Sequence, residues 1–172
     1  GRKISKSVGK GLTLDTWVQY APLESLLFYL FQSPGQAKRL FWGIVPKSVD
    51  DYLAALRQYP SLEPGKQPDA AAWHIFDKGR RVPAYDSSIN FSLINNLISA
   101  LGAEDASLVL EYLKRYDPSC EAAEEMLADL VRKGMNYYRD HVLPNKRYRE
   151  PTEAERQLLQ RIHDRLALSE GA

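Results

Sequence analysis

Apolar residues recur at intervals of three and four along most of this 172-residue chain, which is the spacing of one face of an α-helix. Two clear runs are Leu23, Leu26, Leu27, Leu30 and Phe31, and Ile89, Leu93, Ile94, Leu97, Ile98 and Leu101. The second run ends at Gly102, a residue that commonly stops helices. The strict alternation typical of strands is not sustained in the sequence. We therefore expect an all-α protein, a helical bundle in two packed groups of helices.

Other helices are predicted from the same spacing and from residues that start or stop helices. Predicted N-terminal caps are Ser33 with Gln36, Ser48, and Thr152 with Glu155. The predicted helices cover residues 23–31, 33–41, 48–59, 70–76, 106–116, 121–142 and a stretch from about 153. The last helix is expected to turn four apolar residues inward: Leu158, Leu159, Ile162 and Leu166.

Proline and glycine interrupt the pattern between residues 60 and 83 and divide the chain. We expect a loop at 1–11, a helical domain at 12–59, a proline-rich linker with a short helix at 60–83, and a second helical domain at 84–172. Trp17, Trp42 and Trp73 are expected to be packing residues.

The composition is that of an ordinary globular protein, with 44% hydrophobic and 26% charged residues. No apolar run approaches the roughly 18 residues that span a bilayer, and we expect neither a signal peptide nor a membrane partner. A single cysteine, Cys120, excludes an internal disulfide and favours a reducing, cytoplasmic location. Its thiol is predicted to be inert.

The net charge of +1 hides an uneven distribution. Residues 1–47 carry a net charge of +5, residues 104–129 carry −6, and residues 132–165 carry +4. A polyanion could contact both basic segments while the acidic segment faces away. The same runs could also be ordinary solvated helix faces.

The sequence offers few residues for metal or nucleophilic chemistry. His74, His141 and His163 are far apart, and no cysteine or carboxylate stands near them at a metal-ligand spacing. We predict no metal site. Walker A, nucleophile-elbow and HExxH motifs are absent from the sequence.

The run "GRKISKSVGKG" at residues 1–11 is the densest polar motif in the chain. Lysine ammonium groups, serine hydroxyls and exposed backbone amides on a glycine-flanked loop can bind phosphate. We expect this loop to be mobile, with Lys3 and Lys6 in solvent.

"KISKS", residues 3–7, resembles the KMSKS signature of class I aminoacyl-tRNA synthetases, with Ile4 in place of methionine. The following sequence is similar to class I lysyl-tRNA synthetases in "YAPLESL" at 20–26, "AKRL" at 37–40, "VDDYL" at 49–53, "WHI" at 73–75 and "INFSLINNL" at 89–97. The chain departs from the family at Val8 and Lys10, where lysine and asparagine are usual.

This resemblance implies ATP-dependent attachment of lysine to tRNA-Lys. Lys6 would be the main cation that stabilises the pyrophosphate of ATP, which is bound with Mg, and Lys3 an auxiliary one. Ile4, Ser5 and Ser7 would complete the nucleotide-binding loop. The family's catalytic domain, with its HIGH-type motif and lysine pocket, precedes this signature, so we expect this polypeptide alone to be inactive. We expect it to lack part of the enzyme at both ends.

The resemblance also implies that the helices bind tRNA, and we expect no DNA partner. Phosphate contacts would come from Lys38, Arg39 and Lys47 in the first half, and from Arg139, Lys146, Arg147 and Arg149 in the second. Tyr148 could stack on a base. Tyr137 and Tyr138 lie on a predicted helix, and at least one of them is expected in the core.

Two alternatives stay open at the level of sequence. The chain could come from a class I synthetase with another amino-acid specificity, which would share the loop but not the "YAPLESL" continuation. It could also be a stand-alone helical module that binds RNA or protein, with an accidental signature match.

Overall fold

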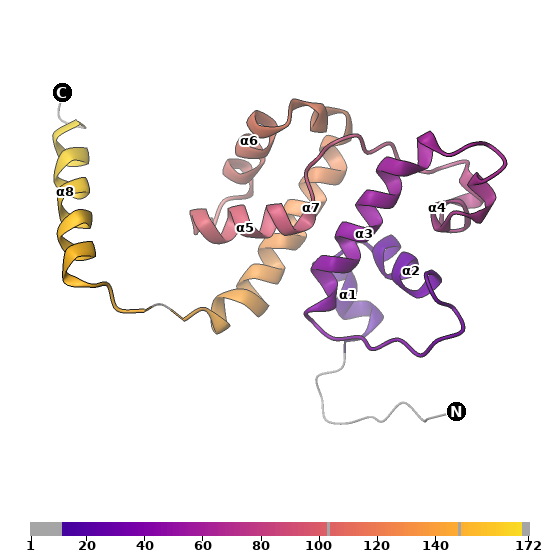
Figure 1. The fold of residues 1–172 in the computed structure, drawn as a ribbon, viewed down its shortest axis with the longest axis horizontal. Coiled ribbons are helices and arrows are strands. Elements are labelled where there is room, and N and C mark those ends of the chain that lie inside the picture. Colours follow the sequence, from indigo (N-terminus) through magenta and orange to yellow (C-terminus); the bar gives the residue numbers. More distant parts are fainter. Residues whose placement is uncertain (1–11, 103, 148, 170–172) are drawn as a thin grey trace.

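Helices α1 to α4 form one group and α5 to α7 a second group that packs against it in the computed structural model (Figure 1). The structure describes residues 12–102, 104–147 and 149–169. These residues contain helices and no strand, which confirms the all-α prediction. The helix bounds are α1 Leu14–Tyr20, α2 Leu23–Phe31, α3 Ile44–Gln58, α4 Ala71–Ile75, α5 Phe91–Leu101, α6 Ala106–Tyr116, α7 Glu124–Tyr137 and α8 Glu153–Ser169.

The buried side chains of the two groups form one continuous core. Helix α3 contributes a complete helical face to it, made of Val45, Val49, Leu53 and Leu56. Gly134 lets α7 approach α5 closely, because a Cβ added there would lie only 3.1 Å from Ile98 Cδ1. The two groups therefore share their apolar interior.

A carboxylate joins the groups at the start of α5. Asp50 of α3 accepts hydrogen bonds at Oδ1 from the backbone N–H of Phe91, at 2.7 Å, and of Ser92, at 3.1 Å. These amides belong to the first turn of α5, which has no intrahelical acceptor for them. Asp50 thus caps a helix that lies 41 residues later in the chain.

Short turns flank α4 in residues 60–83, as the prolines of this stretch predict. Two 3₁₀ turns, Tyr59–Ser61 and Gln67–Asp69, lie before α4, and a third, Asp77–Gly79, follows it. The predicted stop at Gly102 is confirmed, because this residue ends α5 with a left-handed φ of 58°. Helix α7 begins after a 3₁₀ turn, Pro118–Ala123, and continues into a π-helical turn, Tyr138–Val142, and a 3₁₀ turn, Leu143–Asn145.

The predicted helix at 33–41 is wrong. Ser33 closes a single turn with Gln36 and the chain then runs without regular structure to α3. Tyr29 holds this segment from the side: its hydroxyl donates to Arg39 O at 3.1 Å, and its own carbonyl accepts from Lys38 Nζ at 2.6 Å. The two apolar residues that end the segment, Leu40 and Phe41, are exposed, so a helix here would have had no face to bury.

Ser48 was also wrong as an N-terminal cap. Helix α3 starts at Ile44, with Pro46 in its first turn, where the lack of an N–H costs nothing. Ser48 is therefore buried in the second turn.

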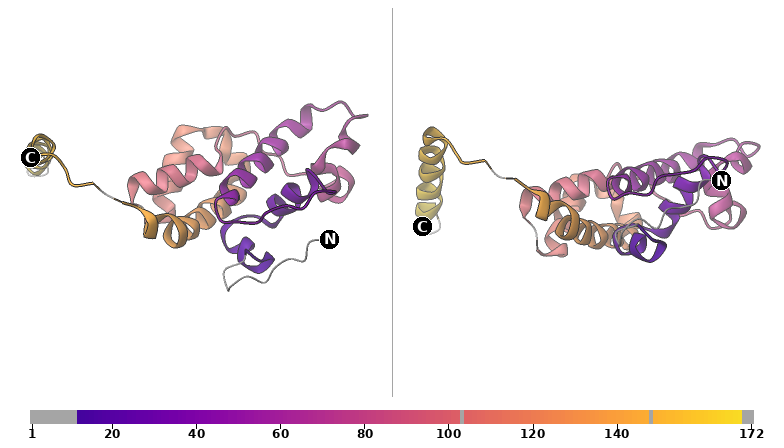
Figure 2. Two further views of the ribbon diagram at one scale, coloured as in Figure 1. Left: turned by 60° about the horizontal axis from the view of Figure 1, so that its bottom comes forward. Right: turned by 90° about the horizontal axis from the view of Figure 1, so that it is seen from below.

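Two helices were predicted correctly, but much of their apolar face is exposed. In α2, Leu26 of the predicted face is buried together with Ser25 and Phe28, because α3 packs on that side, whereas Leu23, Leu27, Leu30 and Phe31 are exposed. Helix α8 begins with the predicted capping box, in which Thr152 N–H donates to Glu155 Oε2 at 2.8 Å. Its residues Leu158, Leu159 and Ile162 are nevertheless exposed, because α8 lies apart from the other helices (Figures 1 and 2).

Within the described residues, no helix has both the length and the apolar character needed to cross a bilayer.

Candidate nucleic-acid interface

The signature residues Lys3, Ile4, Ser5, Lys6 and Ser7 lie outside the described residues, and so do Val8 and Lys10. The expected mobility of their loop therefore stays a prediction. The described chain begins at Leu12 and enters α1 at once. Helix α1 is therefore the element through which residues 1–11 join the folded helices.

Residues at both ends of α1 explain why it forms here. At its start, Thr13 and Thr16 form a capping box, with Thr13 N–H donating to Thr16 Oγ1 at 2.7 Å. Trp17, one turn into the helix, is fully buried. Its indole N–H donates to Ser25 Oγ at 3.1 Å and to Pro22 O at 3.2 Å, which fixes α1 against the start of α2.

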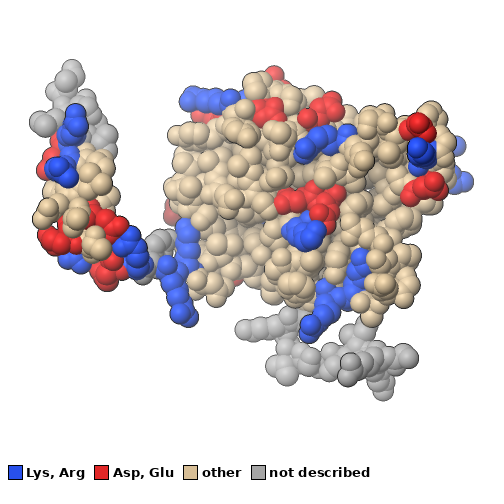
Figure 3. Space-filling model, in the orientation of Figure 1, with Lys and Arg blue, Asp and Glu red and all other residues tan. Residues whose placement is uncertain are grey.

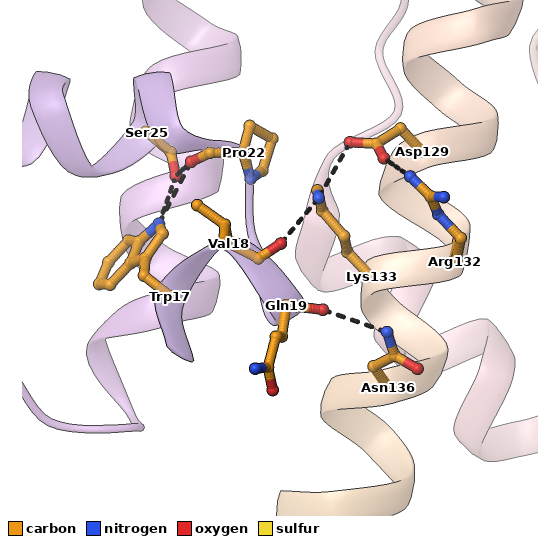
Figure 4. Close-up of polar contacts among 9 residues, drawn as sticks. All are labelled: Trp17, Val18, Gln19, Pro22, Ser25, Asp129, Arg132, Lys133 and Asn136. Carbon is orange, nitrogen blue, oxygen red and sulfur yellow. Dashed lines mark hydrogen bonds and ion pairs between the residues drawn. The ribbon is translucent and has the colours of Figure 1, made fainter. Parts of the chain in front are cut away.

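The end of α1 is bound by two side chains of α7. Lys133 Nζ donates to Val18 O at 2.9 Å, and Asn136 Nδ2 donates to Gln19 O at 3.1 Å (Figure 4). Sequence reasoning missed both residues. The one available signal was that Lys133 lies three residues after Leu130 and four before Tyr137, at the edge of the apolar face of α7.

An aromatic cluster lies where α1 and the 32–43 segment meet the π-helical turn. The rings of Trp42 and His141 stack with centroids 3.9 Å apart, and Tyr20 meets His141 edge-on at 4.8 Å. Tyr137 donates its hydroxyl to Trp42 O at 3.2 Å. The predicted packing role of Trp42 and core position of Tyr137 are confirmed.

Burial governs the protonation of this cluster. It lowers the pKa of His141, against the opposing effect of Asp140, and so favours the neutral ring. Burial also raises the pKa of Tyr20, whose hydroxyl donates to Asp140 Oδ2 at 3.1 Å. Arg139 binds both oxygens of the same carboxylate and lowers its pKa.

The three basic candidates of the first half differ in how they are held. Lys38 lies half-buried over the Tyr29 ring, 4.4 Å from its centroid, and is engaged with the Tyr29 carbonyl. Lys47 is exposed and pairs with Asp51 at 2.7 Å, which raises its pKa. Arg39 is exposed, and its guanidinium has no ion pair within the described residues.

The basic candidates of the second half also differ in their exposure and in their partners. Lys146 is half-buried and donates to Ser99 O at 3.0 Å and to the Tyr138 hydroxyl at 3.2 Å. Arg149 pairs with Glu155, which places it at the start of α8. Arg147 is exposed and, within the part of the chain that the structure describes, has no ion pair. Tyr148 lies outside the described residues.

Arg147 and Arg149 line a surface hollow between the 146–152 segment and α8, together with Pro151, Glu155, Leu158 and Leu159. The remaining basic side chains do not merge into one patch on the face shown in Figure 3. They lie in separate groups, several of which adjoin acidic residues.

The described part of the chain offers little for thiol or metal-ion chemistry. Cys120 is buried, and burial raises the pKa of its thiol, in keeping with the predicted inert role. The residues with described positions include no group of three His, Cys, Asp or Glu side chains placed to hold a metal ion.

Comparison with known proteins gives matches along the whole chain. Residues 1–79 match a family model described as "tRNA synthetases class I (K)". The lysine–tRNA ligase of Roseobacter denitrificans is 36% identical over 172 residues, which cover 99% of this chain and 32% of that relative.

Relatives from other bacteria agree with this match. The lysine–tRNA ligase of Rickettsia rickettsii is 34% identical over 97% of this chain, and that of Rickettsia bellii is 34% identical over 96%. The chain spans about a third of the length of these curated relatives. No solved structure matches the chain.

Proposed function

We propose that this chain belongs to the class I lysyl-tRNA synthetase family, forms part of a lysine–tRNA ligase and supplies its signature loop and tRNA-binding helices. The observation that carries this proposal is the similarity over 99% of the chain, from the KISKS residues to the end of α8. All three relatives named above are lysine ligases, which favours lysine over another amino acid.

In this proposal the signature residues act on ATP while lysine is activated. Lys6 stabilises the negative charge that develops on the pyrophosphate, Lys3 assists it, and Ile4, Ser5 and Ser7 shape the loop around the nucleotide and its Mg²⁺. The remaining reactants, lysine and the α-phosphate of ATP, are bound by a catalytic domain outside these 172 residues. The enzyme works in the cytoplasm.

The helices contact tRNA-Lys through two helical parts of the chain, which a linker joins. Residues 12–59 serve as a connecting domain after the loop, 60–83 as a linker, and 84–172 as the first part of an anticodon-binding region. Arg39 and Arg147 are the best suited of the candidates to reach phosphates, since both are exposed and their guanidinium groups form no ion pair with any residue whose position is described.

Lysine-dependent exchange of pyrophosphate into ATP tests this function in the complete protein that contains this chain. The wild-type protein is expected to catalyse the exchange, and Lys6→Ala is expected to lower kcat by about 100-fold or more. Lys66→Ala is the matched control, because Lys66 is exposed and its ion pair, with Glu63 at 3.0 Å, is a local surface contact. The 172-residue chain alone is expected to catalyse no exchange. A complete protein without lysine-dependent exchange would contradict the proposal.

A further inference from the structure

The carbonyl groups at the end of α1 are satisfied by side chains from the other half of the chain. A helix leaves its last four carbonyls without intrahelical donors and carries partial negative charge at that end. Within α1, Ala21 N–H donates to Trp17 O at 2.9 Å. The next two carbonyls, of Val18 and Gln19, are bound instead by Lys133 and Asn136 of α7 (Figure 4).

Helix α1 depends on contacts of this kind for its position. It has only seven residues, and a helix of that length is not stable alone in water. Its last turn contains no basic residue, so the cation that suits its C-terminal end comes from α7. Trp17 holds the opposite side of α1 to α2, and α1 is thus fixed from two directions.

Lys133 is held in place by its surroundings. Its side chain is only 14% exposed, and its ammonium group lies 3.5 Å from Asp129 Oδ2, one turn earlier on α7. Asp129 also binds Arg132, whose side chain is 70% exposed and makes no described contact with α1. Two neighbouring cations of α7 therefore share one carboxylate, but only Lys133 reaches α1.

We propose that Lys133 and Asn136 are positioning residues for lysine activation: by holding the end of α1, they fix the helix to which the signature residues are attached through the chain. This inference rests on the proposed function. Residues 1–11 are covalently continuous with the start of α1, so a shift of α1 shifts the attachment of the signature residues. Misplacement of a catalytic group by about 1 Å can reduce a rate by about 100-fold.

The test compares Lys133→Met with Arg132→Met in the complete protein. Both variants remove one positive charge from α7 and one partner of Asp129, but only the first removes a donor to α1. Lys133→Met is expected to lower kcat of lysine-dependent ATP–pyrophosphate exchange by about 10- to 100-fold with an unchanged KM for lysine. Arg132→Met is expected to match the wild-type protein.

A second variant keeps the test decisive if Lys133→Met does not fold. Asn136→Asp keeps the side-chain shape but replaces the donor to Gln19 O with an oxygen, and it is expected to lower kcat in the same way. Hydrogen exchange on the 172-residue chain gives a readout without catalysis. The amides of α1 are expected to exchange faster in Lys133→Met than in Arg132→Met.

The outcomes separate this inference from the proposed function. An active wild-type protein whose Asn136→Asp and Lys133→Met forms have wild-type kcat would overturn the positioning role alone. Unchanged exchange of the α1 amides would overturn the structural link. A wild-type complete protein with no lysine-dependent exchange would overturn the proposed function and, with it, this inference.

Discussion

At the scale of single residues, three carboxylates form hydrogen bonds that connect distant parts of the sequence. Asp50, Asp117 and Asp140 each accept hydrogen bonds from residues far away in the sequence. Several surface ion pairs, such as Lys47 with Asp51, join residues only three or four positions apart. Exposed pairs of this local kind contribute little to stability.

Asp117 makes the stability of the protein sensitive to acid. Its carboxylate accepts hydrogen bonds from Ser119, from Ser87 Oγ at 2.8 Å and from Ser88 N–H at 2.7 Å, and these donors hold its pKa well below the usual value. A carboxyl group with a lowered folded-state pKa stabilises the fold above its unfolded pKa of about 4, and this contribution is lost as pH falls toward the folded pKa.

Asp117→Asn is therefore expected to lower the free energy of unfolding at neutral pH and to weaken its decline between about pH 5 and pH 2. Urea unfolding of both proteins across this range measures the effect. Equal declines in the wild-type protein and the variant would show that Asp117 does not control the acid response.

Arg147 offers a single-residue test of the RNA surface. Its exposed guanidinium is expected to neutralise one phosphate, so Arg147→Ala should weaken binding of the 172-residue chain to tRNA-Lys and reduce the slope of log K against log salt by about 0.7 to 0.9. Filter binding at several salt concentrations measures this slope. Lys66→Ala is the control, and a variant that binds like this control would place Arg147 outside the interface.

At the scale of elements, helix ends join the two groups of helices. Helix α3 caps the start of α5 through Asp50, and α7 binds the end of α1 through Lys133. Both contacts connect segments that are far apart in the sequence. The relative position of the groups therefore depends on a few polar side chains as well as on the shared core.

Asp50→Ala is expected to lower the free energy of unfolding by about 1 to 3 kcal/mol, because it leaves the Phe91 and Ser92 amides without an acceptor. Asp51→Ala removes a carboxylate from the next position of the same helix and is expected to change stability by less than about 0.5 kcal/mol. Urea unfolding of both variants measures the difference. Equal losses would refute the capping role of Asp50.

The sequence allowed most helices to be predicted but not what they pack against. The helices at 23–31, 70–76, 89–101 and 106–116 lie where periodicity and stop signals predict them. Leu158 and Leu159 were expected to be buried because their spacing is that of an apolar face, and spacing alone does not supply a neighbouring helix. Ser48 failed as a cap because α3 already starts at Ile44, with Pro46 in its first turn.

The candidate site shows the same limit. Short sequence motifs identified the signature residues and the basic candidates, but Lys133 meets Val18 across 115 positions of sequence, and no local pattern encodes that contact. The structure also separates candidates that the sequence treats alike. Arg147 has no ion pair among the described residues, whereas its neighbour Arg149 already pairs with Glu155.

At the scale of the whole molecule, the helices connect two parts of the chain that have different roles in the proposed enzyme. The segment before α1 carries the signature residues, and the segment between α7 and α8 carries Lys146, Arg147 and Arg149. The shared core and the α1–α7 contacts connect these regions. This arrangement suits an enzyme that must hold a tRNA and activate an amino acid at the same time.

Transfer of lysine to tRNA by the complete protein tests the central claim most directly. With ATP and an unfractionated tRNA pool, the protein is expected to attach labelled lysine to tRNA-Lys and to attach no other labelled amino acid. Lys6→Ala is expected to lose most of this activity. Charging with a different amino acid, or no charging by a folded complete protein, would contradict the account.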